Sequence, residues 1–491
     1  MARKSTTRFQ LYKRIYAHRQ EMVEDAKKLG ARLKFPEELR GKFGLTPSHS
    51  SYPGPIAKDV LKEMERAGNE GRPLSELVDG LRDVVKDHYG DDYDAVPIAS
   101  GEAALWIAFE TLMAPSFMGR GDAYRSRYIA PFERHLTHQA GFGRLFPPKY
   151  KYVGADRYVT AGELGVEGKH LYNLDTVMVP FKGARYEAHG IKYYPTPLLS
   201  TVDAGASAES FAEVAERHAP FLSGFASLGY DTPGYGYGEK DTANGAPKFQ
   251  TLISKLAARY DVPYVMDDAW GAPIVGNDIR KAGATLMLYS GDKVLRGPLS
   301  GLMIGKDEAI VPIRRAIGTH SHRYGNPSAY AKAAFSAFDP GREAIVALSY
   351  TLRKLAEDPK RYTQAVDQLH RIVTEEMPES VFHQYGRDVL VTKTYNNLAV
   401  EINYDRTWKD GKTGMPIFTE EDSFAGVLPI ETIMSTVGVL PTVTYEGNVL
   451  ISPGHGTIDQ RGGLLEDRAR LGVKALFGAF EIVSRYAAGE G

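Results

Sequence analysis

The sequence predicts an α/β fold in which a mostly parallel seven-stranded sheet lies between helices, with a helical arm before it and a smaller α+β domain after it. Seven short apolar runs alternate with helical patterns through the first two thirds of the chain. Such alternation is typical of parallel strands joined by crossover helices. The chain has 491 residues, and single hydrophobic cores stop growing at roughly 250 to 300 residues. More than one domain is therefore expected.

Residues 1–55 are predicted to form the N-terminal helical arm. Residues 10–33 have the pattern of a charged amphipathic helix. Residues 1–42 hold twelve Lys or Arg against five acidic residues. Since basic helix faces are usually solvated, we expect an arm that packs on a neighbouring subunit rather than a nucleic-acid-binding helix. Two helices, at 56–67 and 74–88, are expected to lead into the sheet.

Residues 56–340 are predicted to form the large domain. Its expected strands are 95–100, 127–132, 176–181, 221–229, 263–271, 284–290 and 301–305. Helices are expected among them at 102–113, 207–218 and 247–260. The last two strands are too close together for the crossover that parallel neighbours need. One of these two strands is therefore expected to be antiparallel to the rest.

Residues 341–491 are predicted to form the small C-terminal domain. The pattern predicts a long helix at about 341–375 and a final helix at about 463–487. Between them lie expected strands at 396–403, 441–446 and 449–452.

Composition excludes several classes of protein. The chain has no cysteine, which excludes a disulfide scaffold and a cysteine nucleophile. Its 60 basic and 61 acidic side chains leave a formal charge of −1, which gives no general attraction to nucleic acid or to anionic membranes. No apolar segment is long enough to span a membrane, and the N-terminus lacks the apolar core of a secretory signal. A cytoplasmic enzyme without nucleic-acid or membrane partners is expected.

Polar residues follow the predicted strands at the ends where open α/β sheets bind their ligands. In "PIASGEAAL", a strand ends at Ser100, Gly101 permits a tight turn, and a helix begins at Glu102. Free amides and the helix dipole make such a turn suitable for an anion. In "PFERHLTHQAG", His135 and His138 follow the next strand, where either ring could lie against a flat ligand or simply start a helix.

Two acids and one lysine follow later strands. "YVMDDAWGA" ends in Asp267 and Asp268, and alternation along a strand places one inward and one outward. The inward acid needs a cationic partner, and no third ligand at useful spacing supports a metal. Lys293 in "YSGDKVLRGPLSGLMIG" comes 26 residues after Asp267, one strand–helix–strand unit later. Asp292 is adjacent to this lysine, but Asp267 is the acid expected to matter, and Ser290 can reach an anion that Lys293 also faces.

These four features together suit pyridoxal phosphate (PLP). A helix N-terminus binds its phosphate, a buried lysine loses its proton more readily and can form an imine, and a carboxylate keeps the pyridine nitrogen protonated. We therefore expect PLP as cofactor and no bound metal.

The same motifs resemble a known superfamily over residues 50–340. The order "SGEAA", "HLTH", "DDA" and "SGDK" followed by "GPLSG" is similar to the fold type I PLP enzymes, and "YSGDKVLRGPLSGLMIG" most resembles the bacterial selenocysteine synthase group and related lyases. The resemblance implies Lys293 as the Schiff-base lysine and Asp267 on the pyridine nitrogen. It implies that His138 stacks on the ring, Ala269 contacts it, and the phosphate is held by Ser100, Gly101, Glu102 and Ser290. It also implies a homodimer or larger oligomer with active sites at subunit interfaces.

The reaction stays open at this stage. We expect an amino-acid substrate and β- or γ-elimination or replacement, as in a lyase or transferase, with an aminotransferase as the alternative. A non-catalytic protein of the same fold or an RNA-binding protein is a further alternative. Additional candidates are Arg296, for phosphate or substrate carboxylate, His455 and Arg461, for substrate carboxylate, and the loop "THSHRYGNPS".

Overall fold

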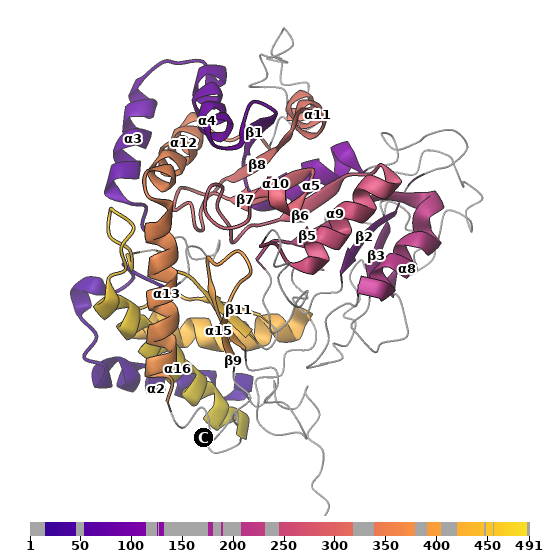
Figure 1. The fold of residues 1–491 in the computed structure, drawn as a ribbon. Helices are drawn as coiled ribbons and strands as arrows, with labels where there is room; N and C mark the ends of the chain where they lie inside the picture. The colour runs from indigo at the N-terminus through magenta and orange to yellow at the C-terminus, as the bar shows by residue number, and fades with distance from the viewer. Residues whose placement is uncertain are drawn as a thin grey trace, which may run out of the picture.

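The computed structural model contains one large and one small β-sheet, with helices packed around them (Figure 1). It describes residues 15–45, 54–113, 125, 127–131, 175–179, 188–189, 208–230, 245–317, 338–378, 390–403, 420–445, 448–454 and 456–488. Among these residues, no helix is long and apolar enough to cross a membrane.

The large sheet confirms the predicted α/β class. Its strands in the described residues are β1 (Tyr93–Ile98), β2 (Arg127–Pro131), β3 (Asp175–Val179), β4 (Ala188–His189), β5 (Leu222–Leu228), β6 (Tyr264–Asp267), β7 (Leu286–Ser290) and β8 (Gly301–Lys306). They lie in the order β1-β8-β7-β6-β5-β2-β3-β4. The pairs from β3 through β2, β5 and β6 to β7 are parallel, and β8 is antiparallel to both β7 and β1. The predicted antiparallel strand is therefore β8. The additional strand β4 has only two residues, too few for a sequence signal.

Helices cover both faces of this sheet because successive strand residues point to opposite sides. Val265 of β6 packs in the same apolar cluster as α5 (Gly101–Leu112). The adjacent Met266 packs in the cluster that contains side chains of α9 (Lys248–Tyr260). In Figure 1, α9 lies in front of the strands and α5 behind them. Other helical segments around the sheet include α8 (Ala208–His218), η2 (Ala219–Phe221), α10 (Ile279–Ala282) and α11 (Asp307–Ile317).

The predicted long helix at 341–375 is two helices, which corrects the expectation. α12 (Arg342–Glu357) ends before Asp358, and α13 (Pro359–Glu376) starts at a proline. Proline lacks an amide donor and disfavours the helical conformation of the residue before it, so the chain breaks there. α12 packs on α3 (Lys58–Asn69) and α4 (Leu74–Tyr89).

The C-terminal part contains a four-stranded antiparallel sheet in the order β11-β12-β10-β9. These strands are β9 (Leu390–Lys393), β10 (Val400–Asn403), β11 (Val443–Tyr445) and β12 (Asn448–Ile451). Helices of this part include α15 (Glu420–Val437) and α16 (Glu466–Ala488), and α13 packs on α16 and on β9. β9 and α15 were not predicted.

The N-terminal arm packs on this C-terminal part of its own chain. α2 (Arg19–Arg32) contacts α15 and α16, and a short turn η1 (Glu37–Leu39) follows. Asp25 accepts hydrogen bonds from Arg485 (2.8 Å) and from the Tyr486 hydroxyl (2.9 Å). The buried side chains of α2 (Met22, Ala26, Leu29) face helices of the same chain, and the expected contact of the arm with a neighbouring subunit stays a prediction.

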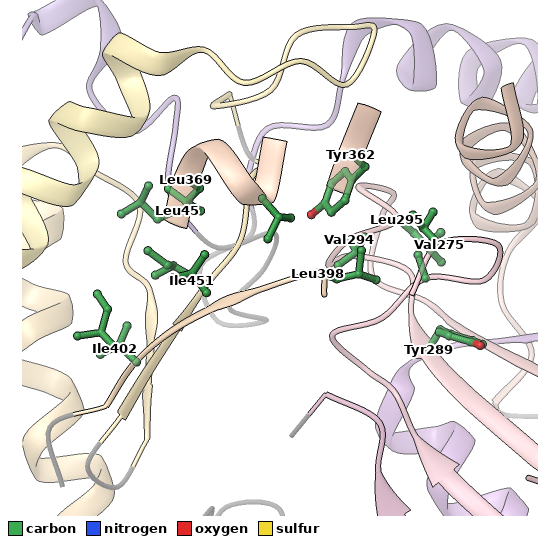
Figure 2. Close-up of a cluster of buried hydrophobic side chains, with 14 of the residues drawn as sticks. Leu45, Val275, Tyr289, Val294, Leu295, Tyr362, Leu369, Leu398, Ile402 and Ile451 are labelled. Carbon is green, nitrogen blue, oxygen red and sulfur yellow. The ribbon is translucent and has the colours of Figure 1, made fainter. Parts of the chain in front are cut away.

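One apolar cluster extends from the large sheet into the C-terminal part. It includes Tyr289 of β7, Val294 after that strand, Leu398 before β10 and Tyr362 of α13 (Figure 2). The segment that carries Lys293 is therefore anchored in a core that both parts of the chain build.

Candidate active site

The turn between β7 and β8, residues 291–300, carries Lys293, and we call it the lysine turn. The amide of Gly291 donates to Ser300 O (2.8 Å), and that of Gly297 donates to Gly291 O (2.8 Å). Val294 and Leu295 are fully buried. Backbone hydrogen bonds and buried side chains thus hold the turn on both sides of Lys293.

Lys293 is partly buried and faces an aromatic ring and two acids. Its Nζ lies 5.1 Å from the ring centroid of Trp270, within the range of a cation–π contact. Burial lowers the pKa of its ammonium, while the carboxylates of Asp292 and Asp267 oppose that shift. Asp292 therefore acts on the lysine more than the sequence indicated. A lysine with a lowered pKa is more easily neutral and hence nucleophilic.

Asp267 is the last residue of β6 and is 4% exposed. Its Oδ1 accepts the amide of Ala269 (2.9 Å). Burial raises the pKa of Asp267 to about 6, against the opposing effects of Lys293 and of that amide. The structure thus places Asp267 within electrostatic reach of Lys293, with Ala269 buried next to it.

The start of α5 lies beside the end of β7. Ser100 caps the helix, since its Oγ accepts the amide of Ala103 (3.0 Å). A methyl group on Gly101 would lie 2.7 Å from Ser290 Oγ, so Gly101 and the buried Ser290 are close neighbours. The amides of Gly101 and Glu102 occupy first-turn positions that have no acceptor within their own helix. Together with the Ser290 hydroxyl, these groups can bind one anion, and the Glu102 side chain is exposed.

Asp268 was expected to point outward if Asp267 points inward, but both are buried. The second acid is covered by residues from two directions. Asn396, just before β10, donates to Asp268 Oδ1 (2.9 Å) and to Trp270 O (3.3 Å). Asn277 donates to Asp268 Oδ2 (3.4 Å) and to Gly229 O (2.6 Å). Asp268 therefore joins the end of β6 to the C-terminal part of the chain.

This burial predicts a pH dependence of stability. Desolvation raises the pKa of Asp268 to about 7, with Asp267 adding to the shift and Asn396 and Asn277 opposing it. Between its ordinary pKa and about 7, the folded chain keeps a proton that the unfolded chain releases, so the free energy of unfolding falls as pH rises. Asp268→Asn should remove the part of this fall that Asp268 causes, which is on the order of a few kcal/mol of unfolding free energy. Urea unfolding at pH 5 and at pH 8 measures the difference.

Asp83→Asn, an exposed acid on α4, is the control for that measurement and should behave as the wild type. The same change in unfolding free energy between pH 5 and pH 8 in wild type and Asp268→Asn would contradict the assignment.

Several predicted residues lie outside the described part of the chain. These are His135, His138, His455 and the loop "THSHRYGNPS". Arg296 and Arg461 are described, and both line a pocket whose lining does not include Lys293. Trp270 was not singled out from the sequence, although it directly follows Ala269 in "DDAWGA". Among the described residues, no group of three potential metal ligands occurs.

No family model matches the sequence, and no curated protein matches it. Solved structures do match the fold. A pyridoxamine–pyruvate aminotransferase from Mesorhizobium loti has a TM-score of 0.52 at 14% identity, over 92% of this chain and 95% of that chain. An amine transaminase from an uncultivated Pseudomonas species, solved with PLP bound, has a TM-score of 0.51 at 14% identity, over 89% and 88%. A chain of a SepCysS–SepCysE N-terminal domain complex has a TM-score of 0.51 at 13% identity, over 92% of this chain and 97% of that chain. The chain therefore has the fold of the fold type I PLP-dependent enzymes.

Proposed function

We propose that this protein is a PLP-dependent enzyme that acts on an amino-acid substrate, with Lys293 as the residue that binds the cofactor covalently. The observation that carries the proposal is the placement of Lys293 near the buried acid Asp267, at the carboxyl ends of two adjacent parallel strands. A lysine with a lowered pKa beside a buried carboxylate, at this edge of an α/β sheet, is typical of a functional site.

The residues present fit the cofactor at several points. The Trp270 indole N–H is buried and has no hydrogen-bond partner in the described part of the chain, and buried donors normally have one. A bound aromatic ligand with polar substituents would supply an acceptor. Gly101 and Ser290 are close enough to share one phosphate, together with the Ser100 hydroxyl and the first amides of α5. Asp267 would hold a positive charge on a ring nitrogen.

When bound, PLP supplies an electron sink for a carbanion at the substrate's α-carbon. The chain's own groups would do the rest. Lys293 Nζ, once released from the cofactor, would accept and return the α-proton, since its lowered pKa favours the neutral amine. Trp270 would restrict where that amine lies. His138, if it stacks on the ring as the resemblance implies, would help to hold the ring in place.

We further propose elimination or replacement at the β- or γ-carbon, as in a lyase or transferase. An aminotransferase is the second candidate, and the aminotransferase and transaminase names of two similar structures support it. We also propose residues 56–340 as the cofactor-binding domain, 341–491 as the small domain and 1–55 as the arm, in a homodimer or larger oligomer.

The test is an amino-acid screen of the purified protein with added PLP. A lyase releases ammonia and a keto acid, or forms a substituted amino acid when a nucleophile is supplied. An aminotransferase instead converts the cofactor to its pyridoxamine form, which a keto acid reverses. A protein that shows no spectral change with added PLP would exclude both candidates.

A further inference from the structure

We propose a second binding site, for a small anion with phosphate or carboxylate groups, between the lysine turn and the C-terminal part of the chain. A pocket of about 340 Å³ lies there. Its charged lining residues are Arg296, Lys354, Glu357, Asp358, Arg361 and Arg461. We call it the basic pocket. This site is separate from the cofactor site and does not depend on it.

The ion pairs within the basic pocket leave two arginines available. Lys354 pairs with Glu357 (3.2 Å), and Arg361 pairs with Asp459 (3.4 Å). Among the residues that the structure describes, neither Arg296 nor Arg461 forms an ion pair, although the charge of Arg461 helps to lower the pKa of Asp459. Arginine presents a planar set of donors that suits the oxygens of phosphate and carboxylate. An anion is therefore the ligand that these two side chains fit.

The pocket also lies at the N-terminus of a long helix. Asp358 directly precedes α13, and Arg361 and Tyr362 lie in its first turn. The helix dipole favours negative charge at this end, although Pro359 has no amide hydrogen and the Arg361 amide donates to Asp358 O (3.3 Å). The dipole of α13 thus adds to the attraction of the arginines.

Arg296 is held in a backbone conformation that arginine rarely adopts. Its φ is +56°, in the left-handed region, where glycine would be unstrained. Its amide donates to Lys293 O (2.9 Å). An arginine at a position that favours glycine points to a use for its side chain. That side chain lies near enough to Tyr362 to affect the pKa of its hydroxyl, whereas Lys293 lies against Trp270.

Arg461 is presented by a loop that is fixed independently. The Asp459 carboxylate accepts the amides of Arg461 (2.8 Å) and Gly463 (2.8 Å). Gly462 has a φ of +88°, which only glycine adopts readily. The loop geometry therefore does not depend on the Arg461 side chain, which is exposed. An anion bound by both Arg296 and Arg461 would join the lysine turn to the C-terminal loop.

The test measures thermal unfolding of the full chain with saturating PLP, at constant ionic strength set with chloride. Inorganic phosphate and citrate are the two probes, so that phosphate and carboxylate ligands are distinguished. We expect at least one probe to raise the midpoint in a saturable way. Arg461→Gln and Arg296→Gln should each weaken its apparent affinity by about tenfold or more. Lys360→Gln, which removes an exposed charge from the same helix end, should leave the affinity unchanged.

Three outcomes would overturn the proposal. One is the absence of a saturable shift with either probe. Another is an equal response in Arg461→Gln, Arg296→Gln and Lys360→Gln, which indicates general charge screening. The third is a response lost only in Ser290→Ala, which places the ion in the cofactor site. Because Arg461 is exposed on a loop that Asp459 fixes, Arg461→Gln should fold even if Arg296→Gln does not.

Discussion

Lys293→Ala should give a protein that does not acquire the visible absorbance of bound PLP and that turns over substrate at least about 10³-fold more slowly. Alanine has no amine to bind the cofactor covalently or to move a proton. The readouts are the absorption spectrum after dialysis against PLP and the rate with the best substrate from the amino-acid screen. Truncation also removes the cation from Trp270 and from both nearby acids.

Lys306→Ala is the matched control for this variant. Lys306 ends the strand that follows the lysine turn, is exposed and lies near Tyr93 rather than in the site. Its removal should leave colour and rate unchanged. A coloured and active Lys293→Ala protein would refute the role of this lysine.

Asp267→Asn should lower the turnover number by roughly 10² to 10⁴-fold, with a smaller effect on cofactor affinity. Asparagine keeps the shape and can still accept the amide of Ala269, but it cannot carry the negative charge that stabilises a protonated ring nitrogen. Steady-state rates at saturating PLP measure the effect. The wavelength of the bound cofactor's absorbance gives a second readout, because it depends on the charge beside the ring.

Asp268→Asn separates the two neighbouring acids in the same assay. Asp268 is equally buried but is bound by Asn396 and Asn277 rather than facing the lysine. The Asp268→Asn variant should lose at most about tenfold in rate, because the substitution only disturbs the contact between the two parts of the chain. A larger loss in Asp268→Asn than in Asp267→Asn would reverse the assignment.

The sequence could predict those parts of the candidate site whose positions follow from the order and direction of the strands. Ser290 and Lys293 follow one strand, Asp267 ends its parallel neighbour, and Ser100 follows a strand that runs in the same direction two positions away. Parallel strands bring their carboxyl ends to one edge, so residues distant in sequence meet. The structure confirms this convergence through the contact between Gly101 and Ser290 and the electrostatic effect of Lys293 on Asp267.

Other features could not be read from local patterns. Asn396 meets Asp268 across 128 residues of chain, and no periodicity links them, because that contact depends on how the C-terminal part packs. Trp270 was not singled out from the sequence, because an apolar strand end predicts burial and not that the indole ring lies against Lys293. The break before Pro359 had a local signal in the proline itself, which the strong helical pattern on both sides outweighed.

The central claim is that Lys293 binds PLP covalently, and reductive trapping tests it most directly. The PLP-loaded protein is treated with borohydride, digested with a protease and analysed by mass spectrometry. We expect a single stoichiometric phosphopyridoxyl modification on Lys293, in the peptide that contains "YSGDK". A modification on another lysine, or the absence of a stable modification at saturating PLP, would contradict the account.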